Sequence, residues 1–184
     1  MATFKDNPMS NNSVPLSVIA NPNNQYYWGQ VGIGNNVTTQ SQKGGYWILV
    51  VDRSSLQVVY NQVQGSPSQA PDIGNFNTPD YLLIVATLGV GLNNPPQGDL
   101  FQFLDVNGGG RELRRIEQIA FQFNCGSLGT FGYALVGILG NTNQPGFEAS
   151  QVGLSGVGPI LTVQLMPMNI GGKTVYTPVQ IDNA

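Results

Sequence analysis

Apolar residues gather in short runs along the chain, and the spacing within these runs predicts mainly β-strands. Two runs, Tyr81–Leu88 and Tyr133–Leu139, contain no charged residue and are too short for a typical buried helix. They flank the segment Arg111–Phe123, in which apolar residues recur every three or four positions. This spacing predicts a helix with one apolar face, formed by Leu113, Ile116, Ala120 and Phe123. We expect Gly126 to end that helix.

The N-terminal part of the chain predicts two β-hairpins. The first joins Val14–Ala20 to Gln25–Val31, and the second joins Tyr46–Asp52 to Leu56–Tyr60. Gly32–Gly45 and the Pro- and Gly-rich segment Gly65–Pro79 are interpreted as loops. A loop as long as the second is unusual in a compact domain, which makes it a candidate interaction element.

The C-terminal part predicts two more strands after a turn-rich connector. Pro159–Leu165 and Lys173–Ile181 alternate apolar and polar residues, as half-exposed edge strands do. Paired with Val14–Ala20, they would extend a sheet. Between the hairpins and the main helix, Asp99 is expected to cap a short helix over Leu100–Leu104.

Together these elements predict a mainly β fold with short helices (α+β), in which antiparallel sheets are flanked by one or two helices. We expect one globular domain over residues 14–184, with additional N- and C-terminal strands. Residues 1–13 are polar and rich in Asn and Ser, and are expected to form a flexible arm.

Composition narrows the possible partners. Charged residues make up 9% of the chain, far below the usual quarter, and the net charge is −3. No basic stripe is available for a nucleic-acid backbone, and no apolar run reaches the roughly 20 residues of a membrane helix. Histidine is absent and Cys125 is the single cysteine, so we expect no metal, no cofactor and no enzymatic activity. No secretory signal is recognisable.

Two groups of residues are candidate binding sites. Aromatic rings can stack on the C–H faces of a sugar while amides bind its hydroxyls, and the chain offers Asn24, Tyr26, Tyr27 and Trp28 together. Core packing is the more common role of such a cluster, because alternate residues of a strand face opposite sides. Gly108–Gly110 followed by Arg111 and Arg114 suggests an anion site at a helix N-terminus, although these glycines also suit a chain reversal.

Several of these segments resemble a known domain. They are Gly45–Asp52 with Val58 and Val59, Tyr81–Thr87, the helix around Leu113, and Gly132–Gly140. In this order, over residues 44–140, they resemble the GG domain of the interleukin-like EMT-inducer family. The resemblance implies antiparallel sheets with short helices, as in secreted cytokine-like proteins, a glycosyltransferase stem and hyaluronan-related proteins. Some members bind sugars. The paired cysteines of the animal proteins are missing here.

The sequence therefore favours a non-enzymatic, lectin-like carbohydrate-binding protein that acts outside the cell or on a surface. The alternative is a structural subunit of a self-assembling filament, appendage or virion, in which the arm and the C-terminal strands pair with neighbouring copies. A low surface charge suits that alternative, because closely packed copies repel one another little. Either way, we expect a homo-oligomer or a glycan as partner. An enzyme of unfamiliar type is the third interpretation.

Overall fold

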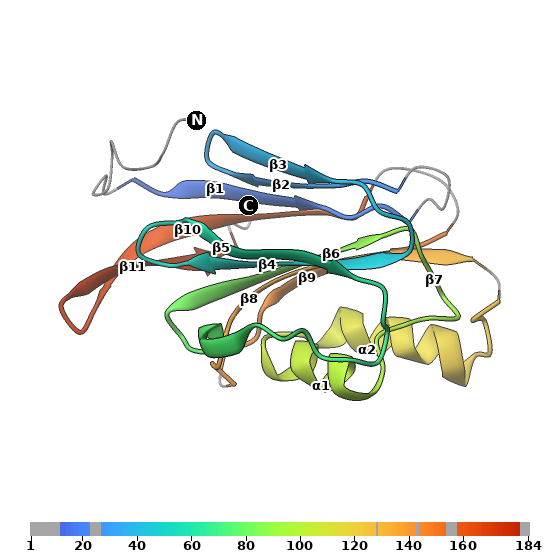
Figure 1. The fold of residues 1–184 in the computed structure, drawn as a ribbon. Coiled ribbons are helices and arrows are strands. Elements are labelled where there is room, and N and C mark those ends of the chain that lie inside the picture. The colour runs from blue at the N-terminus through green and yellow to red at the C-terminus, as the bar shows by residue number, and fades with distance from the viewer. Residues whose placement is uncertain (1–11, 23–26, 128, 143, 154–157, 181–184) are drawn as a thin grey trace.

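Two antiparallel sheets and a layer of helices form the protein (Figure 1). The computed structural model describes residues 12–180 except 23–26, 128, 143 and 154–157. The outer sheet has the strand order β11-β10-β1-β2-β3, and its strands are β1 (Val14–Ile19), β2 (Gly29–Ile33), β3 (Asn36–Gln40), β10 (Ile160–Ile170) and β11 (Lys173–Val179). The expected mainly β fold with short helices is confirmed.

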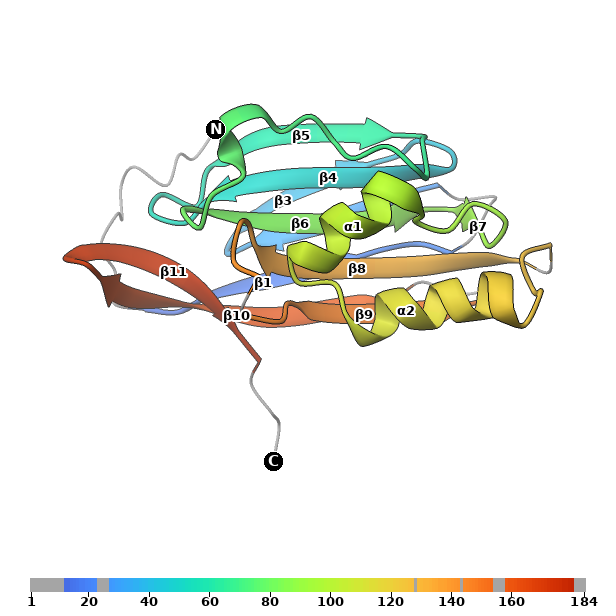
Figure 2. The ribbon, with the colours of Figure 1, turned by 90° about the horizontal axis from the view of Figure 1, so that it is seen from below.

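The central sheet lies between the outer sheet and the helices. Its main order is β5-β4-β6-β8, and both β7 and β9 pair with β8. Its strands are β4 (Gly45–Asp52), β5 (Val58–Gln64), β6 (Tyr81–Leu88), β7 (Val90–Gly91), β8 (Thr130–Ile138) and β9 (Phe147–Val152). The helices α1 (Gly98–Val106) and α2 (Arg111–Glu117) cover the face turned away from the outer sheet (Figure 2).

The uninterrupted apolar sequences of β4, β6 and β8 follow from this arrangement, because each strand is buried on both faces. In β4, Trp47 and Leu49 pack between the two sheets, whereas Tyr46 and Ile48 pack against the helical layer. Burial of each aliphatic side chain contributes about 1.5–3 kcal/mol. The sandwich and the helical layer therefore have separate cores that share one sheet.

The N- and C-terminal parts of the chain meet in the outer sheet. β1 pairs with β10 in antiparallel register, with Val18 opposite Leu161 and Leu16 opposite Val163. These four side chains are buried against the central sheet. The C-terminal strands thus extend the sheet of β1 as expected. Of these two strands, β11 alone is an edge strand, since β10 lies between β11 and β1.

The interpretation of Gly32–Gly45 as a loop is wrong. β2 continues to Ile33, and a two-residue turn at Gly34 and Asn35 leads directly into β3. Gly34 has φ +58°, which a two-residue hairpin turn requires and which glycine adopts without strain. β9 was also missed within the turn-rich connector.

The main helix differs from the predicted one in its second half. The α-helical hydrogen bonding ends at Glu117, and a π-helical turn follows over Gln118–Gln122. Leu113, Ile116 and Ala120 are buried as expected, but the side chain of Phe123 is 70% exposed. A π-turn contains more residues than an α-turn, so it rotates the following residues away from the predicted apolar face.

The shorter helix also begins differently from expectation. α1 starts at Gly98 with Gln97 at its N-cap position, so Asp99 lies in the first turn and is not the cap. Asp99 remains well placed there, because a negative charge near a helix N-terminus is favourable.

Two further expectations concern the long loop and the N-terminal arm. Gly65–Pro79 is a loop with one short 3₁₀ turn, Gly74–Phe76, and its Ile73 packs into the helical-layer core. Apart from Asn12 and Ser13, the expected arm over residues 1–13 lies outside the described residues. No helix among the described residues is both long and apolar enough to cross a membrane.

Candidate functional site

The predicted sugar-binding cluster is described only in part. Tyr27 and Trp28 come immediately before β2 and are both half-buried, while Asn24 and Tyr26 lie outside the described residues. The strand starts at Gly29, after both residues, and the expectation that Tyr26 and Trp28 share one face stays a prediction because Tyr26 lies outside the described residues. The ammonium group of Lys43 lies 5.5 Å from the centre of the Tyr27 ring. At this distance the cation is attracted to the ring face on which a sugar would stack.

The amides at the N-terminus of α2 hold a carboxylate of the same chain. Glu148, on β9, accepts hydrogen bonds from the backbone N–H of Glu112 (3.2 Å) and of Leu113 (3.3 Å). The hydroxyl of Tyr133 also donates to this carboxylate, at 2.6 Å. Complete burial, together with the negative charge of Glu148, raises the pKa of Tyr133 well above its usual value. The donors expected to bind an external anion therefore bind Glu148.

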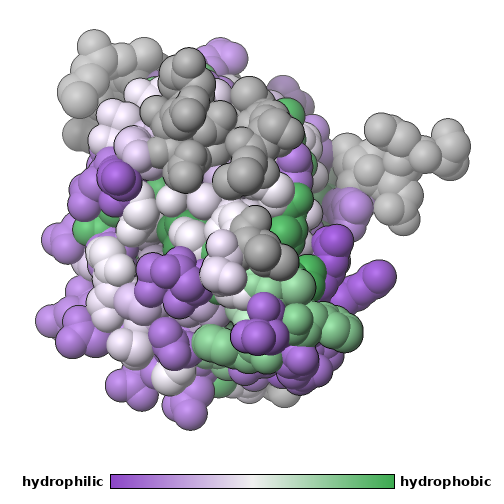
Figure 3. All heavy atoms as spheres, turned by 90° about the vertical axis from the view of Figure 1, so that its right-hand side faces the viewer, coloured by the Kyte–Doolittle hydropathy of each residue, from purple (hydrophilic) through white to green (hydrophobic). Residues whose placement is uncertain are grey.

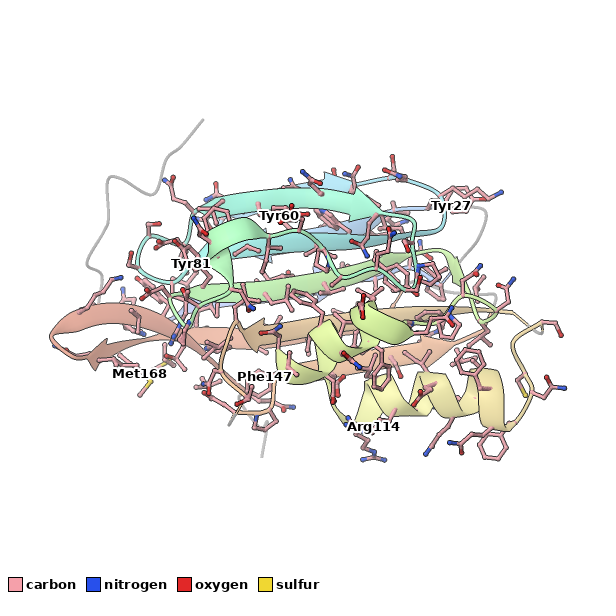
Figure 4. All side chains as sticks on the ribbon, turned by 60° about the horizontal axis from the view of Figure 1, so that its bottom comes forward. Tyr27, Tyr60, Tyr81, Arg114, Phe147 and Met168 are labelled. Carbon is pink, nitrogen blue, oxygen red and sulfur yellow. The ribbon has the colours of Figure 1, made fainter. Side chains whose placement is uncertain are left out.

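The two arginines predicted for the anion site point elsewhere. The side chain of Arg111 is 94% exposed, and the guanidinium of Arg114 pairs with Asp105 of α1 at 2.7 Å. Figure 4 shows Arg114 on the helical layer, pointing away from the sheets. The structure does not bring these arginines together with the aromatic residues, because Tyr27 lies at the far edge of the molecule in the same view.

A polar cluster continues beside the α2 N-terminus. The carboxylate of Glu112 accepts hydrogen bonds from Ser150 Oγ and, at 3.2 Å, from Arg115. Partial burial opposes ionisation of Glu112, but these hydrogen bonds outweigh it and hold the pKa of Glu112 below its ordinary value. Each acid of this cluster therefore has partners that stabilise the packing of α2 on β9.

The outer edge of β11, one edge strand of the outer sheet, is hydrogen-bonded by Arg53 from the turn after β4. We call this contact the closure of β11. The backbone N–H of Tyr176 donates to the carbonyl of Arg53 (2.8 Å), and Nε of Arg53 donates back to the carbonyl of Tyr176 (2.9 Å). Pro178, two positions further along the same edge, has no N–H to offer. Another strand therefore cannot pair along this part of β11.

The guanidinium of Arg53, which forms these contacts with β11, is a buried charge. Its side chain is 5% exposed, and its two terminal nitrogens donate to the carbonyl of Pro79 (2.6 Å) and to Thr177 Oγ1 (2.7 Å). Burial lowers the pKa of Arg53 from its ordinary value, and the nearby charge of Asp80 opposes that shift. Within the described part of the chain, no carboxylate forms an ion pair with Arg53.

Asp52 fixes the turn that presents Arg53. Its Oδ1 accepts hydrogen bonds from the backbone N–H groups of Ser54 (2.8 Å) and Ser55 (2.9 Å), and from both serine hydroxyls. Burial disfavours the charge, but these donors prevail and lower the pKa of Asp52.

By contrast, β3 and β5 are open edges. Among the described residues, β3 pairs only with β2, and β5 pairs only with β4. In the view of Figure 2, both strands lie on the side of the sandwich away from β9 and β10. We call the strands Asn36–Gln40 and Val58–Gln64 together the open side.

The open side has few of the features that usually protect a sheet edge, although the register of β5 against β4 shifts between Val50 and Val51, as it does at a β-bulge. Neither strand contains a charged residue or a proline, and both contain Val, Asn and Gln. The side chains of Val37, Val58 and Val59 are 59%, 40% and 39% exposed. Edges without charge, proline or cover are the ones that pair with another chain.

Exposed apolar side chains also occur at the end of the main helix. Phe121 is 52% exposed and Phe123 is 70% exposed. Figure 3 looks onto this end of the molecule and shows apolar surface low on it, at the level of the helices. Across the described residues, no group of three or more Cys, Asp and Glu side chains is arranged to hold a metal ion.

No protein-family model matches the chain, and no curated protein matches it. The resemblance to the GG domain therefore remains a prediction from the sequence pattern. The sequence pattern did not predict the open side or the hydrogen bonds of Arg53 to β11. A Gly-Asn pair between two short runs is a known hairpin signal and could have revealed β3. No local signal could have linked Arg53 to Thr177, 124 positions later.

Proposed function

We propose that this protein is a non-enzymatic structural subunit that associates with copies of itself along the open side. An antiparallel pair of equivalent edge strands, related by a two-fold axis, would continue a sheet from one copy into the next. Backbone hydrogen bonds give such a contact its affinity, and apolar side chains beside the strands add buried area. The observation that carries this proposal is that two uncharged edge strands lie on one side, each paired on one edge alone among the described residues.

The distribution of charge supports the same proposal. Among the five strands of the outer sheet, Lys173 is the sole charged residue. The helical layer, in contrast, carries Asp99, Asp105 and the charges of α2. Neutral surfaces approach one another without the repulsion that a net charge of −3 would otherwise cause. Assembly through the outer sheet and the open side would leave the charged helices facing water.

The strands involved differ from those first expected to pair with neighbours. β10 is an interior strand, and β11 is closed by Arg53 and Pro178. Self-association through the C-terminal strands would therefore require part of the fold to open. We assign the contact to β3 and β5, because no described residue pairs with the outer edge of either strand.

Carbohydrate binding is a second candidate, favoured by one observation. Tyr27 and Trp28 are neighbouring aromatic residues that both remain half-buried at the surface. The sugar-binding members implied by the GG-domain resemblance agree with this candidate, as does a location outside the cell or on a particle. A glycan array with the wild type and Trp28→Ala tests it: sugar binding that is lost in a folded variant supports it, and absence of binding by the wild type rejects it.

Sedimentation velocity over a wide range of protein concentration tests self-association. We expect the wild type to form dimers or larger species as its concentration rises. Val37→Lys places a charge on β3 and should weaken association at least about tenfold, or about 1.4 kcal/mol. Val106→Lys is the matched control, because Val106 is 48% exposed but lies on α1. A wild type that stays monomeric, or equal effects of both variants, would contradict the proposal.

A further inference from the structure

A cleft lies where the β10–β11 hairpin passes the end of the central sheet. Its volume is about 600 Å³, within the range of about 300–1,000 Å³ that is typical of small-molecule sites. Figure 4 shows Met168, which lines it, at the end of the molecule opposite Tyr27. The cleft is therefore separate from the open side and from the aromatic residues.

Most of the cleft surface is aliphatic. One wall comes from the hairpin, with Met168, Ile170 and Val175, and the other includes Ile138 at the end of β8. The side chains of Met168 and Ile170 are 47% and 55% exposed. An alkyl chain placed between these side chains would remove apolar surface from water on both sides, at about 25 cal/mol per Å².

The polar part of the cleft carries a net positive charge. Arg53, Lys173 and Asp80 are its charged residues, and the exposed pair of Lys173 with Asp80 (3.4 Å) compensates one cation. Arg53 remains, buried and without a carboxylate in contact within the described residues. A cationic cleft on a protein of net charge −3 favours an anion at this place.

The guanidinium of Arg53 has donors left for a ligand. A guanidinium carries five N–H groups. Three of the Arg53 hydrogen bonds go to neutral acceptors, namely the carbonyls of Tyr176 and Pro79 and the hydroxyl of Thr177. The second N–H of each terminal nitrogen is therefore not used by these three hydrogen bonds. Hydrogen bonds from a guanidinium to a carboxylate are stronger than those to neutral oxygens, so an anion gains more here than a neutral ligand.

We propose that this cleft binds a carboxylate that carries an aliphatic chain, with the carboxylate at Arg53 and the chain against Ile138, Met168 and Ile170. This ligand class suits the cleft because a positively charged group and a larger area of apolar side chains line it together. The site is independent of the proposed self-association, since it shares no residue with the open side.

Calorimetric titration with octanoate, and with octan-1-ol as the neutral analogue, tests the proposal. We expect octanoate to bind and octan-1-ol to bind at least about tenfold more weakly, which corresponds to about 1.4 kcal/mol. Methyl NMR should show shifts at Ile138, Ile170 and Val175 upon addition of octanoate. Equal binding of both compounds, no binding of octanoate, or shifts confined to other methyl groups would overturn the proposal.

Two variants on β10 test whether octanoate binds in the cleft or elsewhere on the surface. Met168→Asp brings a negative charge into the cleft and should weaken octanoate binding at least about tenfold. Met166→Asp is the matched control, because Met166 is 40% exposed on the same face of β10 but does not line the cleft. Arg53→Lys retains the charge and should bind octanoate more weakly than the wild type. Because Arg53 also supports the fold, the test of the site is the comparison of Met168→Asp with Met166→Asp. Equal affinity of these two variants would contradict the site.

Discussion

β11 and β3 are the two edge strands of one sheet, but within the described part of the chain only the outer edge of β11 is hydrogen-bonded by residues from elsewhere in the fold. β11 is held by Arg53, which exchanges backbone and side-chain hydrogen bonds with Tyr176, and is blocked at Pro178. β3 pairs with β2 alone among the described residues and contains neither charge nor proline. β5, the neighbouring edge of the central sheet, likewise pairs with one strand alone among the described residues, although its register against β4 shifts between Val50 and Val51. The fold therefore protects one edge of the outer sheet and leaves the opposite side available.

This difference between the edges indicates which strands can pair with another copy of the protein. Composition alone would make every strand of the outer sheet a candidate, because Lys173 is the sole charge among them. The geometry restricts the choice, since closing β11 uses hydrogen bonds that an added strand would have to replace. In the described part of the chain, no such hydrogen bonds occupy the outer edge of β3 or β5.

Arg53→Met should produce the largest effect, by removing the closure of β11. The variant loses three hydrogen bonds and leaves two buried acceptors, the carbonyl of Tyr176 and the hydroxyl of Thr177, without these donors. We expect the free energy of unfolding to fall by about 3 kcal/mol, measured in urea. Lys173→Met, which breaks only an exposed ion pair, should cost less than about 0.5 kcal/mol. Comparable stability of the two variants would show that β11 needs no closure.

Val59→Lys tests whether β5 contributes to the open side together with β3. A lysine there would be desolvated or displaced when a second strand approaches, so association should weaken about tenfold, or about 1.4 kcal/mol. The unfolding free energy should stay within about 0.5 kcal/mol of the wild type, because Val59 is exposed. If only Val37→Lys disrupts association, then β3 is the contact strand and β5 is not.

Asp52→Asn should have the smallest effect, and the effect should depend on pH. The pKa of Asp52 is lower in the folded than in the unfolded protein, so its charge stabilises the fold above the unfolded value of about 3.9. That contribution is lost as the pH falls through the folded pKa. We expect a loss of about 0.5–1 kcal/mol at neutral pH, which shrinks in acid. A difference that persists below both pKa values would mean that Asp52 acts through its shape alone.

Much of the fold could be predicted from the sequence, because the burial of a strand determines which of its own residues are apolar. Strands buried on both faces must be apolar throughout, and β4, β6 and β8 were recognised on that basis. β3 has no such apolar pattern, since it is a polar edge strand whose exposed residues resemble a loop. The π-turn was missed because Phe123 continues the apolar spacing, although the backbone rotates it into water.

The candidate sites were less predictable, because they depend on residues far apart in the sequence. The glycines before Arg111 correctly indicated a helix N-terminus, but its bound anion is Glu148, 37 positions later on β9. Arg53 looked like an ordinary turn residue, and its role follows only from the passage of β11 beside that turn. A single sequence shows which groups exist but not which distant partner each one meets.

Hydrogen exchange of backbone amides at low and high protein concentration tests the central claim most directly. The account predicts that protection of amides in Val37–Thr39 and Val59–Val63 rises with concentration, while the amide of Tyr176 is already protected and does not change. Protection that rises at β11 instead, or assembly with no gain at β3 and β5, would contradict the assignment of self-association to the open side.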